Sequence, residues 1–130
     1  MKKHMPRQIA TLLIALSVMF SLLAVPASAH PFTDVSSTFW DEFISYVYDN
    51  DIMDGVSTTE FSPYSSVTRA MVVTALYQAE GSPTITYTGI FTDVSESDWY
   101  SKAIAWAASK NIVNGVSPTE FKPNAFVTRE

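Results

Sequence analysis

The chain contains no cysteine, and histidine occurs only at His4 and His30. The lack of cysteine excludes disulfides and thiolate metal sites, so an exported form must be held together by its apolar core alone. With so little histidine, neither a Ser-His-Asp arrangement nor a histidine metal site can be built. Acidic residues are plentiful, which is compatible with a carboxylate pair for glycoside hydrolysis, but no two of them are fixed in a recognisable catalytic pattern. The sequence therefore predicts a protein that is not an enzyme.

Positive charge is also scarce once the first 29 residues are set aside. There, three basic residues precede an apolar run from Ile9 to Val25, which ends in Pro-Ala-Ser-Ala before His30. This order predicts a secretory signal peptide over residues 1–29, with a retained membrane anchor as the alternative. Residues 30–130 then carry five Lys and Arg against 13 acids, a formal charge of −8. Such a charge disfavours nucleic acids and anionic membranes as partners.

What the chain does have is an internal repeat. Residues 55–70 read GVSTTEFSPYSSVTRA and residues 115–130 read GVSPTEFKPNAFVTRE, with ten of 16 positions identical. Pairing 32–40 with 91–99 and 41–70 with 101–130 leaves Tyr100 unpaired and gives 18 identities in 39 pairs. A single unit of this length cannot bury its own apolar helices, so neighbouring units are expected to stack. We expect a first repeat over 30–83, a linker over 84–90 and a truncated second repeat over 91–130, as in a fragment or the start of a longer chain.

Each unit is predicted to begin with a short helix, which makes the fold class mainly α. In the first unit Trp40, Ile44 and Val47 recur at helical spacing, and Thr38 with Asp41 suits a capping pair. The equivalent residues of the second unit are Trp99, Ala103, Trp106 and Ala107 for the apolar stripe and Ser95 with Asp98 for the cap.

A second, longer helix is predicted to begin at Thr68 and to end at Gly81-Ser82-Pro83. Its expected buried face consists of Met71, Val72, Ala75, Leu76 and Ala79. In the loop between the helices, Gly55 and Gly115 suit a turn with positive φ. Phe61 and Phe121 are expected to pin that loop to the core, and residues 84–90 read as a β-prone linker.

The repeated residues resemble the S-layer homology family, whose units open with F-x-D-V near a Trp, carry a glycine turn and F-x-P, and reach T-R-A at the long helix. The resemblance covers nearly all of residues 30–130. The matches are Phe32, Asp34, Val35, Trp40, Gly55, Phe61, Pro63, Thr68, Arg69 and Ala70 in the first unit, and Phe91, Asp93, Val94, Trp99, Gly115, Phe121, Pro123, Thr128 and Arg129 in the second.

The resemblance implies helix-loop-helix repeats that join in threes into a pseudo-threefold spindle around their long helices, here incomplete because a third repeat is missing. It also implies a non-catalytic module that binds secondary cell-wall polysaccharide, often pyruvylated, in grooves between repeats. Such a module anchors an exported protein at the cell wall and is usually fused to a cargo domain. One departure is Met71, which stands where the family often has Glu, so the reciprocal half of a capping box is lost.

Arg69 and Arg129 are the strongest candidates for glycan contact. They are the only arginines after residue 29 and occupy the same repeat position. A guanidinium at a helix N-terminus suits a carboxylate such as pyruvate. The alternative is an ion pair with an acid of a neighbouring turn, such as Asp34 or Asp93. Thr68 and Thr128 belong to the same signature.

Three further residue pairs are candidates with structural alternatives. Trp40 and Trp99 could stack on a sugar ring, but their place on the apolar stripe favours the core. Asp34 and Asp93 could bind sugar hydroxyls or cap the turn before the first helix. Gly55 and Gly115 serve backbone geometry first and close approach of a ligand second.

No metal or cofactor is expected. Residues 49–60 partly match an EF-hand loop, but the glycine falls at position 7 instead of 6, and the twin segment replaces three acids. Two other functions remain open beside wall anchoring. One is a structural surface-layer protein that acts through contacts between subunits, and the other is the targeting end of a wall-active hydrolase.

Overall fold

The computed structural model describes residues 30–35 and 39–128. These contain three helices, α2 (Asp41–Asp49), α3 (Arg69–Ala79) and α4 (Ser101–Ser109). The described residues form no strand, only an isolated antiparallel bridge between Thr68 and Phe126. The mainly α prediction is therefore confirmed. The predicted signal peptide, Thr38 and Arg129 lie outside the described residues.

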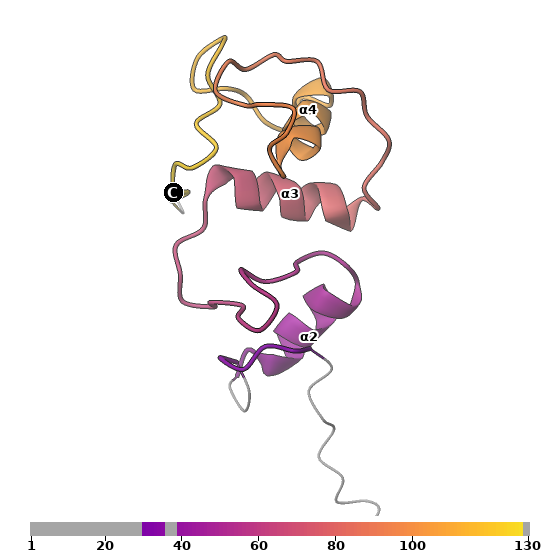
Figure 1. Cartoon of the computed structure of the whole chain (residues 1–130), viewed down its shortest axis with the longest axis vertical. Helices are drawn as coiled ribbons and strands as arrows, with labels where there is room; N and C mark the ends of the chain where they lie inside the picture. Colours follow the sequence, from indigo (N-terminus) through magenta and orange to yellow (C-terminus); the bar gives the residue numbers. More distant parts are fainter. Residues whose placement is uncertain (1–29, 36–38, 129–130) are drawn as a thin grey trace, which may run out of the picture.

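The three helices follow one another along the long axis of the molecule, with α3 between α2 and α4 (Figure 1). Among the described helices, α3 and α4 are the pair that packs together. By sequence α3 belongs to the first repeat, yet it packs on the short helix of the second. No described helix is long and apolar enough to cross a bilayer.

Helix α3 begins and ends where the sequence predicts. Thr68 is its N-cap, and its hydroxyl accepts a hydrogen bond from the N–H of Met71 at 3.3 Å. Beyond its C-terminus Gly81 adopts a φ of +80°, the left-handed conformation that commonly ends helices.

In the second repeat, the short helix α4 begins several residues after its predicted cap, Ser95 with Asp98. The carboxylate of Asp98 accepts a hydrogen bond from the N–H of Ser95 at 2.8 Å, but α4 starts only at Ser101. The N-cap of α4 is Tyr100, which makes no side-chain capping bond. The Ser95–Asp98 pair therefore braces the turn before the helix, and the prediction that it caps the helix was wrong.

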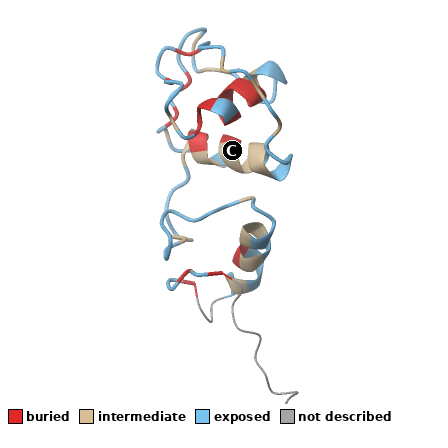
Figure 2. Ribbon diagram, turned by 45° about the vertical axis from the view of Figure 1, so that its right-hand side comes forward, coloured by how far each residue is buried: buried red, intermediate tan, exposed pale blue. Residues whose placement is uncertain are grey.

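The main core lies between α3 and α4. It gathers Ala70 and Val73 of α3 with Ala103, Ile104, Trp106 and Ala107 of α4, and with Phe91, Val94, Tyr100 and Phe121 of the surrounding loops. Tyr77 packs edge-on against Trp106, with ring centroids 5.6 Å apart. Figure 2 shows the buried residues concentrated on α4 and the facing side of α3.

The buried face of α3 differs from the predicted one. Ala70, Val73 and Tyr77 face the core, whereas Val72 and Leu76 are exposed. Both stripes have helical spacing, and the position of α4 decides which one is covered. Because α4 comes from the next repeat, the sequence of the helix itself does not contain this information.

A smaller cluster surrounds α2. It consists of Phe32, Val35 and Ile44, with Tyr48 and Phe61 packed against it. These residues match members of the main core at equivalent repeat positions, and Phe121 is fully buried as predicted. The first repeat thus builds the same loop cluster, and no long helix among the described residues covers it.

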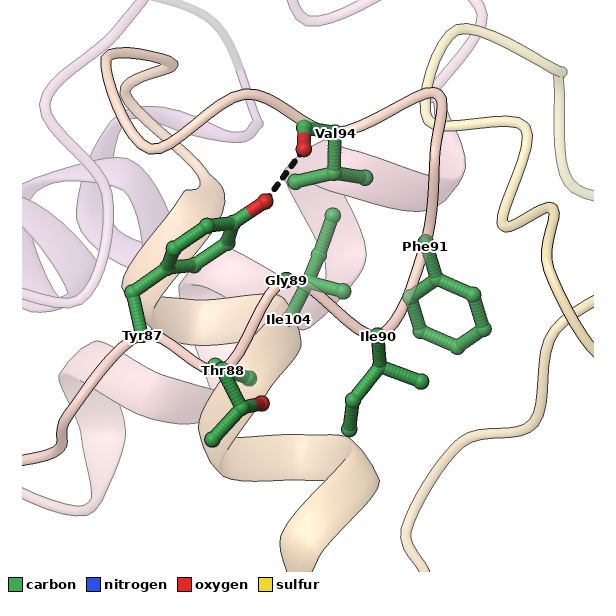
Figure 3. Close-up of a pocket in the computed structure, with 8 residues that line it drawn as sticks. Tyr87, Thr88, Gly89, Ile90, Phe91, Val94 and Ile104 are labelled. Atoms are coloured by element: carbon green, nitrogen blue, oxygen red, sulfur yellow. Dashed lines mark hydrogen bonds between the residues drawn. The ribbon is translucent and has the colours of Figure 1, made fainter.

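Residues 84–90 run as coil, so their β-prone composition does not produce a strand. Ile85 and Tyr87 pack against the main core, and the Tyr87 hydroxyl donates a hydrogen bond to the carbonyl of Val94 (Figure 3). The cavity beneath this segment holds about 10 Å³. That space is enough for about one water molecule and too small for a ligand.

Candidate functional site

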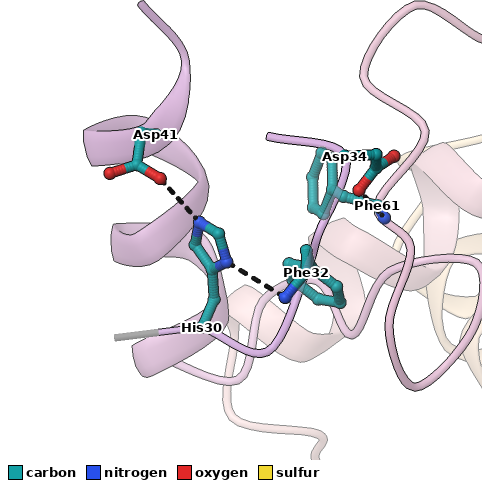
Figure 4. Close-up of polar contacts among 5 residues, drawn as sticks. All are labelled: His30, Phe32, Asp34, Asp41 and Phe61. Atoms are coloured by element: carbon teal, nitrogen blue, oxygen red, sulfur yellow. Dashed lines mark hydrogen bonds and ion pairs between the residues drawn. The ribbon is translucent and has the colours of Figure 1, made fainter. Parts of the chain in front are cut away.

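The carboxylates of Asp34 and Asp93 each link the start of a repeat to the turn before its long helix. The carboxylate of Asp34 accepts a hydrogen bond from the N–H of Phe61 at 3.0 Å (Figure 4). It accepts a second from the N–H of Ser62 at 2.7 Å. Asp93 does the same for Phe121 and Lys122, at 2.9 and 2.7 Å. The turn that they hold lies before the long helix, not before the short helix as one alternative predicted.

These hydrogen bonds lower the pKa of both carboxyl groups. For Asp34 the leading cause is the N–H of Phe61. For Asp93 the largest influence is burial, which raises the pKa, but the N–H groups of Phe121 and Lys122 together outweigh it. Both side chains are ionised at neutral pH and stabilise a turn in which Ser62 and Lys122 have positive φ.

Gly55 and Gly115 allow an aromatic ring to approach the backbone. A Cβ at Gly55 would lie 2.5 Å from the Phe32 ring, and one at Gly115 would lie 2.6 Å from the Phe91 ring. Gly55 has the predicted positive φ of +80°. The same prediction for Gly115 was wrong, because its φ lies outside that region. The close neighbour in both cases is the protein's own core.

The left-handed residues that follow the short helices are not glycines. Asp51 and Asn111 have φ values of 54° and 57°, two residues after α2 and α4 end. Asp and Asn tolerate this conformation better than other residues with a Cβ. They take the left-handed position directly after each short helix, whereas the predicted glycines lie further along the loop.

Arg69 joins the two repeats. Its Nε donates to the carbonyl of Phe121 at 2.9 Å, and its Nη2 donates to the carbonyl of Asn114 at 2.8 Å. The guanidinium carbon lies 4.5 Å from the centroid of the Phe121 ring. For Arg69 the predicted alternative of an ion pair with Asp34 or Asp93 was wrong, since its hydrogen bonds go to carbonyls and the described residues show no salt bridge that includes it. Within the described residues, Nη1 makes no hydrogen bond, so one edge of the guanidinium is still available.

An open depression of about 500 Å³ lies next to this joint. Its wall includes Asn114, whose carbonyl accepts the hydrogen bond from Arg69, and Ser117 supplies a hydroxyl. The other lining residues are Ile90, Phe91, Ala108, Val113, Gly115 and Pro118. The arginine therefore contacts one wall of an open depression in the second repeat.

Trp40 and Trp99 are on the surface. Their side chains are 44% and 66% exposed, so the preference for a core position was wrong. Both residues precede their helices, and the buried part of each stripe begins only at Ile44 and Ala103. Trp40 packs on the exposed ring of Phe39 at 5.1 Å, and Trp99 packs on Tyr100 at 5.0 Å.

His30 has a structural role that the sequence pattern does not predict. Its buried ring accepts a hydrogen bond from the N–H of Phe32 at Nδ1, at 3.2 Å, while Nε2 lies 3.1 Å from the carboxylate of Asp41 (Figure 4). A histidine that accepts at Nδ1 carries its proton at Nε2, where it donates to Asp41. This places the start of the first repeat against α2.

The remaining candidates add little to a ligand site. Thr68 is occupied as the cap of α3, and Thr128 is exposed at the end of the described chain. In the region that the structure describes, acidic and histidine side chains form no group of three suited to a metal ion.

Comparison with known proteins places this geometry in a family. The model of the S-layer homology domain matches residues 31–70 and 90–130, one range in each of the two repeats. No solved structure gives a match.

Three relatives illustrate the range of similar proteins. An endoglucanase of Bacillus sp. (strain KSM-635) is 34% identical over the whole of this chain and 15% of its own length. An amylopullulanase of Thermoanaerobacterium thermosulfurigenes is 30% identical over 76% of this chain and 5% of its own length. The surface-layer 125 kDa protein of Lysinibacillus sphaericus is 30% identical over 82% of this chain and 9% of its own length. The chain spans a small part of each of these relatives, and it belongs to the S-layer homology domain family.

Proposed function

We propose that this chain is a non-catalytic anchoring module that attaches an exported protein to the cell wall by binding secondary cell-wall polysaccharide. The observation that carries the proposal is the pair of exposed tryptophans at equivalent positions of the two repeats. The other aromatic residues that are identical in the two repeats, Phe32 with Phe91 and Phe61 with Phe121, pack into their clusters.

An exposed tryptophan leaves a large apolar ring in water, which is unfavourable unless something covers it. Repetition of the same exposed ring at Trp40 and Trp99 points to a shared ligand. The apolar C–H face of a sugar ring matches an aromatic plane, and a polysaccharide supplies many such faces. A polysaccharide built of repeating sugar units could therefore contact both tryptophans in the same way.

The charge of the ligand is the second part of the proposal. Residues 30–130 have a formal charge of −8, so an anionic glycan needs a local cation. The free edge of the Arg69 guanidinium supplies one beside the open depression, and a pyruvate carboxylate is a matching acceptor. Arg129 would repeat this arrangement in the second unit. Asp34, Asp93, Gly55, Gly115 and Thr68 support the loops, and we assign them no contact with the sugar.

Two narrower versions of this function rest on the relatives. The endoglucanase and the amylopullulanase favour the attachment of a polysaccharide-degrading enzyme. The surface-layer protein favours a role in a surface lattice. In both versions the module itself supplies attachment, and the difference lies in what is attached.

A binding assay with purified cell-wall sacculi tests the proposal. The exported protein is mixed with sacculi before and after acid extraction of the secondary polysaccharide, and the bound fraction is measured. We expect binding that disappears with the polysaccharide and falls when pyruvate is removed from it. Trp40→Ala and Trp99→Ala should each weaken binding up to about tenfold, the effect of losing an aromatic contact of about 0.5–1.5 kcal/mol.

Tyr64→Ala is the matched control. Tyr64 is an aromatic residue of the first repeat that is 80% exposed, and its counterpart in the second repeat is Asn124. This variant should bind as the parent does. Binding that survives extraction of the polysaccharide, or that is unchanged in the variant lacking both tryptophans, would overturn the proposal.

A further inference from the structure

An asparagine followed by glycine occurs once in this chain. The asparagines are Asn50, Asn111, Asn114 and Asn124, and only Asn114 precedes a glycine. A glycine on the carboxyl side leaves the asparagine amide open to attack by the next backbone nitrogen, because no Cβ hinders the approach. Asparagine is among the chemically labile residues of proteins. The Asn114–Gly115 pair is therefore the most reactive asparagine position that the sequence offers.

Neither of the two groups that would react is held in the structure. Asn114 is exposed, and Gly115 is half-buried. Within the described residues, the side-chain amide of Asn114 makes no hydrogen bond, and neither does the N–H of Gly115. In contrast, the side-chain amide of Asn50 donates to the carbonyl of Tyr46 at 2.8 Å. The amide of Asn114 can therefore turn toward the nitrogen of Gly115.

The peptide unit between Asn114 and Gly115 does have a charged partner. Its oxygen, the carbonyl of Asn114, accepts the 2.8 Å hydrogen bond from Nη2 of Arg69. When the nitrogen of a peptide unit loses its proton, resonance places much of the negative charge on the carbonyl oxygen. A guanidinium bound to that oxygen favours the anionic form. Arg69 therefore stabilises the form of Gly115 that acts as the nucleophile.

We infer that Asn114 is a site of spontaneous deamidation and that Arg69 promotes the reaction. The nitrogen of Gly115 gives its proton to water and attacks Cγ of Asn114. The N–Cγ bond forms, the Cγ–Nδ2 bond breaks, and the leaving group takes a proton from water and departs as ammonia. The resulting succinimide then adds water at either carbonyl, and the ring opens to aspartate or to isoaspartate. Neither product requires a bound glycan, so the reaction is independent of the proposed function.

The first repeat holds an aspartate at the equivalent position. Asp54 precedes Gly55 as Asn114 precedes Gly115. The carboxylate of Asp54 accepts a hydrogen bond from the side-chain amide of Gln78 at 3.0 Å. A carboxylate is thus compatible with this turn, and the aspartate product should leave the second repeat folded.

The isoaspartate product does not fit the turn. It inserts a methylene group into the main chain directly before Gly115. A Cβ on Gly115 would already lie 2.4 Å from the carbonyl oxygen of Ser117 and 2.6 Å from that of Glu120. The N–H groups of Val116 and Ser117 both donate to the carbonyl of Glu120, at 2.8 and 3.3 Å, which fixes the chain on this side. Isoaspartate should therefore distort the joint between the repeats.

Peptide mass spectrometry of the exported protein tests the reaction. The folded protein is incubated at mildly alkaline pH and then digested at acid pH, and conversion of amide to acid is followed at each asparagine. We expect Asn114 to convert at least about tenfold faster than Asn111 and Asn124. Both controls are exposed, and they are followed by Ile112 and Ala125, whose Cβ atoms hinder the attack. Equal rates at the three positions would overturn the assignment.

The role of Arg69 is tested with a variant that keeps a donor and loses the charge. In folded Arg69→Gln, conversion of Asn114 should slow at least about threefold. In denaturant, where the joint is absent, the variant and the parent should convert at the same rate. Lys102→Gln removes a positive charge from an exposed position of α4 and should convert as the parent does. Circular dichroism checks that each variant is folded, and a folded Arg69→Gln protein that converts as fast as the parent would overturn this role.

The effect of the products is measured by denaturant unfolding. Electron-transfer fragmentation distinguishes isoaspartate from aspartate at position 114. The fraction that contains isoaspartate should unfold at a lower denaturant concentration than the parent. Asn114→Asp reproduces the other product and should unfold as the parent does. An isoaspartate fraction as stable as the parent, or an Asn114→Asp protein as unstable as that fraction, would overturn the inferred effect on the joint.

Discussion

The carboxylate of Asp93 holds the backbone N–H of Phe121 at 2.9 Å across 28 residues of sequence. Asp34 holds Phe61 in the same way at 3.0 Å in the first repeat. Each bond ties the start of a repeat to the turn before its long helix. The position of the turn that precedes each long helix therefore depends on one charged side chain in each repeat.

Stability should depend on the ionised form of these two aspartates. Because their pKa values are lower in the folded protein than the ordinary 3.8, their contribution is complete above that value and is lost as the pH falls through the folded pKa values. Asp93→Asn should cost about 1 kcal/mol at neutral pH, since the bonds are charge-assisted but close to solvent. Thermal unfolding at neutral and at acid pH measures this. The deficit of the variant should disappear at acid pH, and Glu96→Gln, at an exposed position, should behave as the parent does.

Gly115→Ala should be more damaging than Gly81→Ala. A Cβ at Gly115 would lie 2.4 Å from the carbonyl oxygen of Ser117 and 2.6 Å from that of Glu120, and backbone cannot move aside easily. Overpacking of this kind costs about 2–3 kcal/mol. Gly81 has a positive φ but open space around it, so alanine there should cost about 1 kcal/mol. Denaturant unfolding of the two variants gives the comparison, and equal losses would contradict it.

The three tryptophans should separate into one that stabilises the fold and two that do not. Trp106→Ala removes a ring that packs on Tyr77 and should cost about 3–5 kcal/mol. Trp40→Ala and Trp99→Ala remove exposed rings and should change the free energy of unfolding by less than about 0.5 kcal/mol. Chemical denaturation followed by far-UV circular dichroism tests this without relying on tryptophan fluorescence.

Arg69→Lys should loosen the joint between the repeats. Lysine has one ammonium group and cannot reproduce two directed contacts to the carbonyls of Phe121 and Asn114 together with stacking on the Phe121 ring. We expect a loss of about 1–3 kcal/mol, which is typical of hydrogen bonds to a charged group. Because the partners are carbonyls and not carboxylates, the difference between variant and parent should be nearly the same at low and at high salt. A difference that disappears in salt would indicate an ion pair instead.

Met71→Glu should stabilise the long helix. Met71 is the third residue after the Thr68 cap, and a glutamate there can reach back to the N–H of Thr68 and complete a capping box. The negative charge also lies in the first turn, which contains no acidic residue at present. We expect a gain of about 0.5–1 kcal/mol in the free energy of unfolding. Met71→Gln is the control for charge, because it keeps the hydrogen bond without the interaction with the helix dipole.

Features that depend on nearby residues were predictable from the sequence. The start of α3 at Thr68 and its end before Gly81 follow from a cap and a left-handed exit within a few residues of each helix end. Phe121 is in the core because the repeat pattern selects its position twice. These predictions needed no knowledge of what the helices pack against.

Features that depend on residues far away in the sequence could not be predicted. The buried stripe of α3 runs through Val73 and Tyr77, instead of Val72 and Leu76, because α4 approaches from that side. Trp99 has the spacing of a core residue, but it lies before the first turn of α4. Its ring is therefore exposed and does not pack in the core. The partners of Asp34 are amides that follow it by 27 and 28 residues, so sequence reasoning left its role open.

The contact of Arg69 with main-chain oxygens has a consequence for how such repeats diverge. A carbonyl is present whatever side chain its residue carries, so Asn114 can be replaced freely as long as the turn keeps its shape. The joint therefore depends on the arginine and on the residues that shape the turn, such as Asp93 and Gly115, and tolerates changes of side chain at the contacted positions.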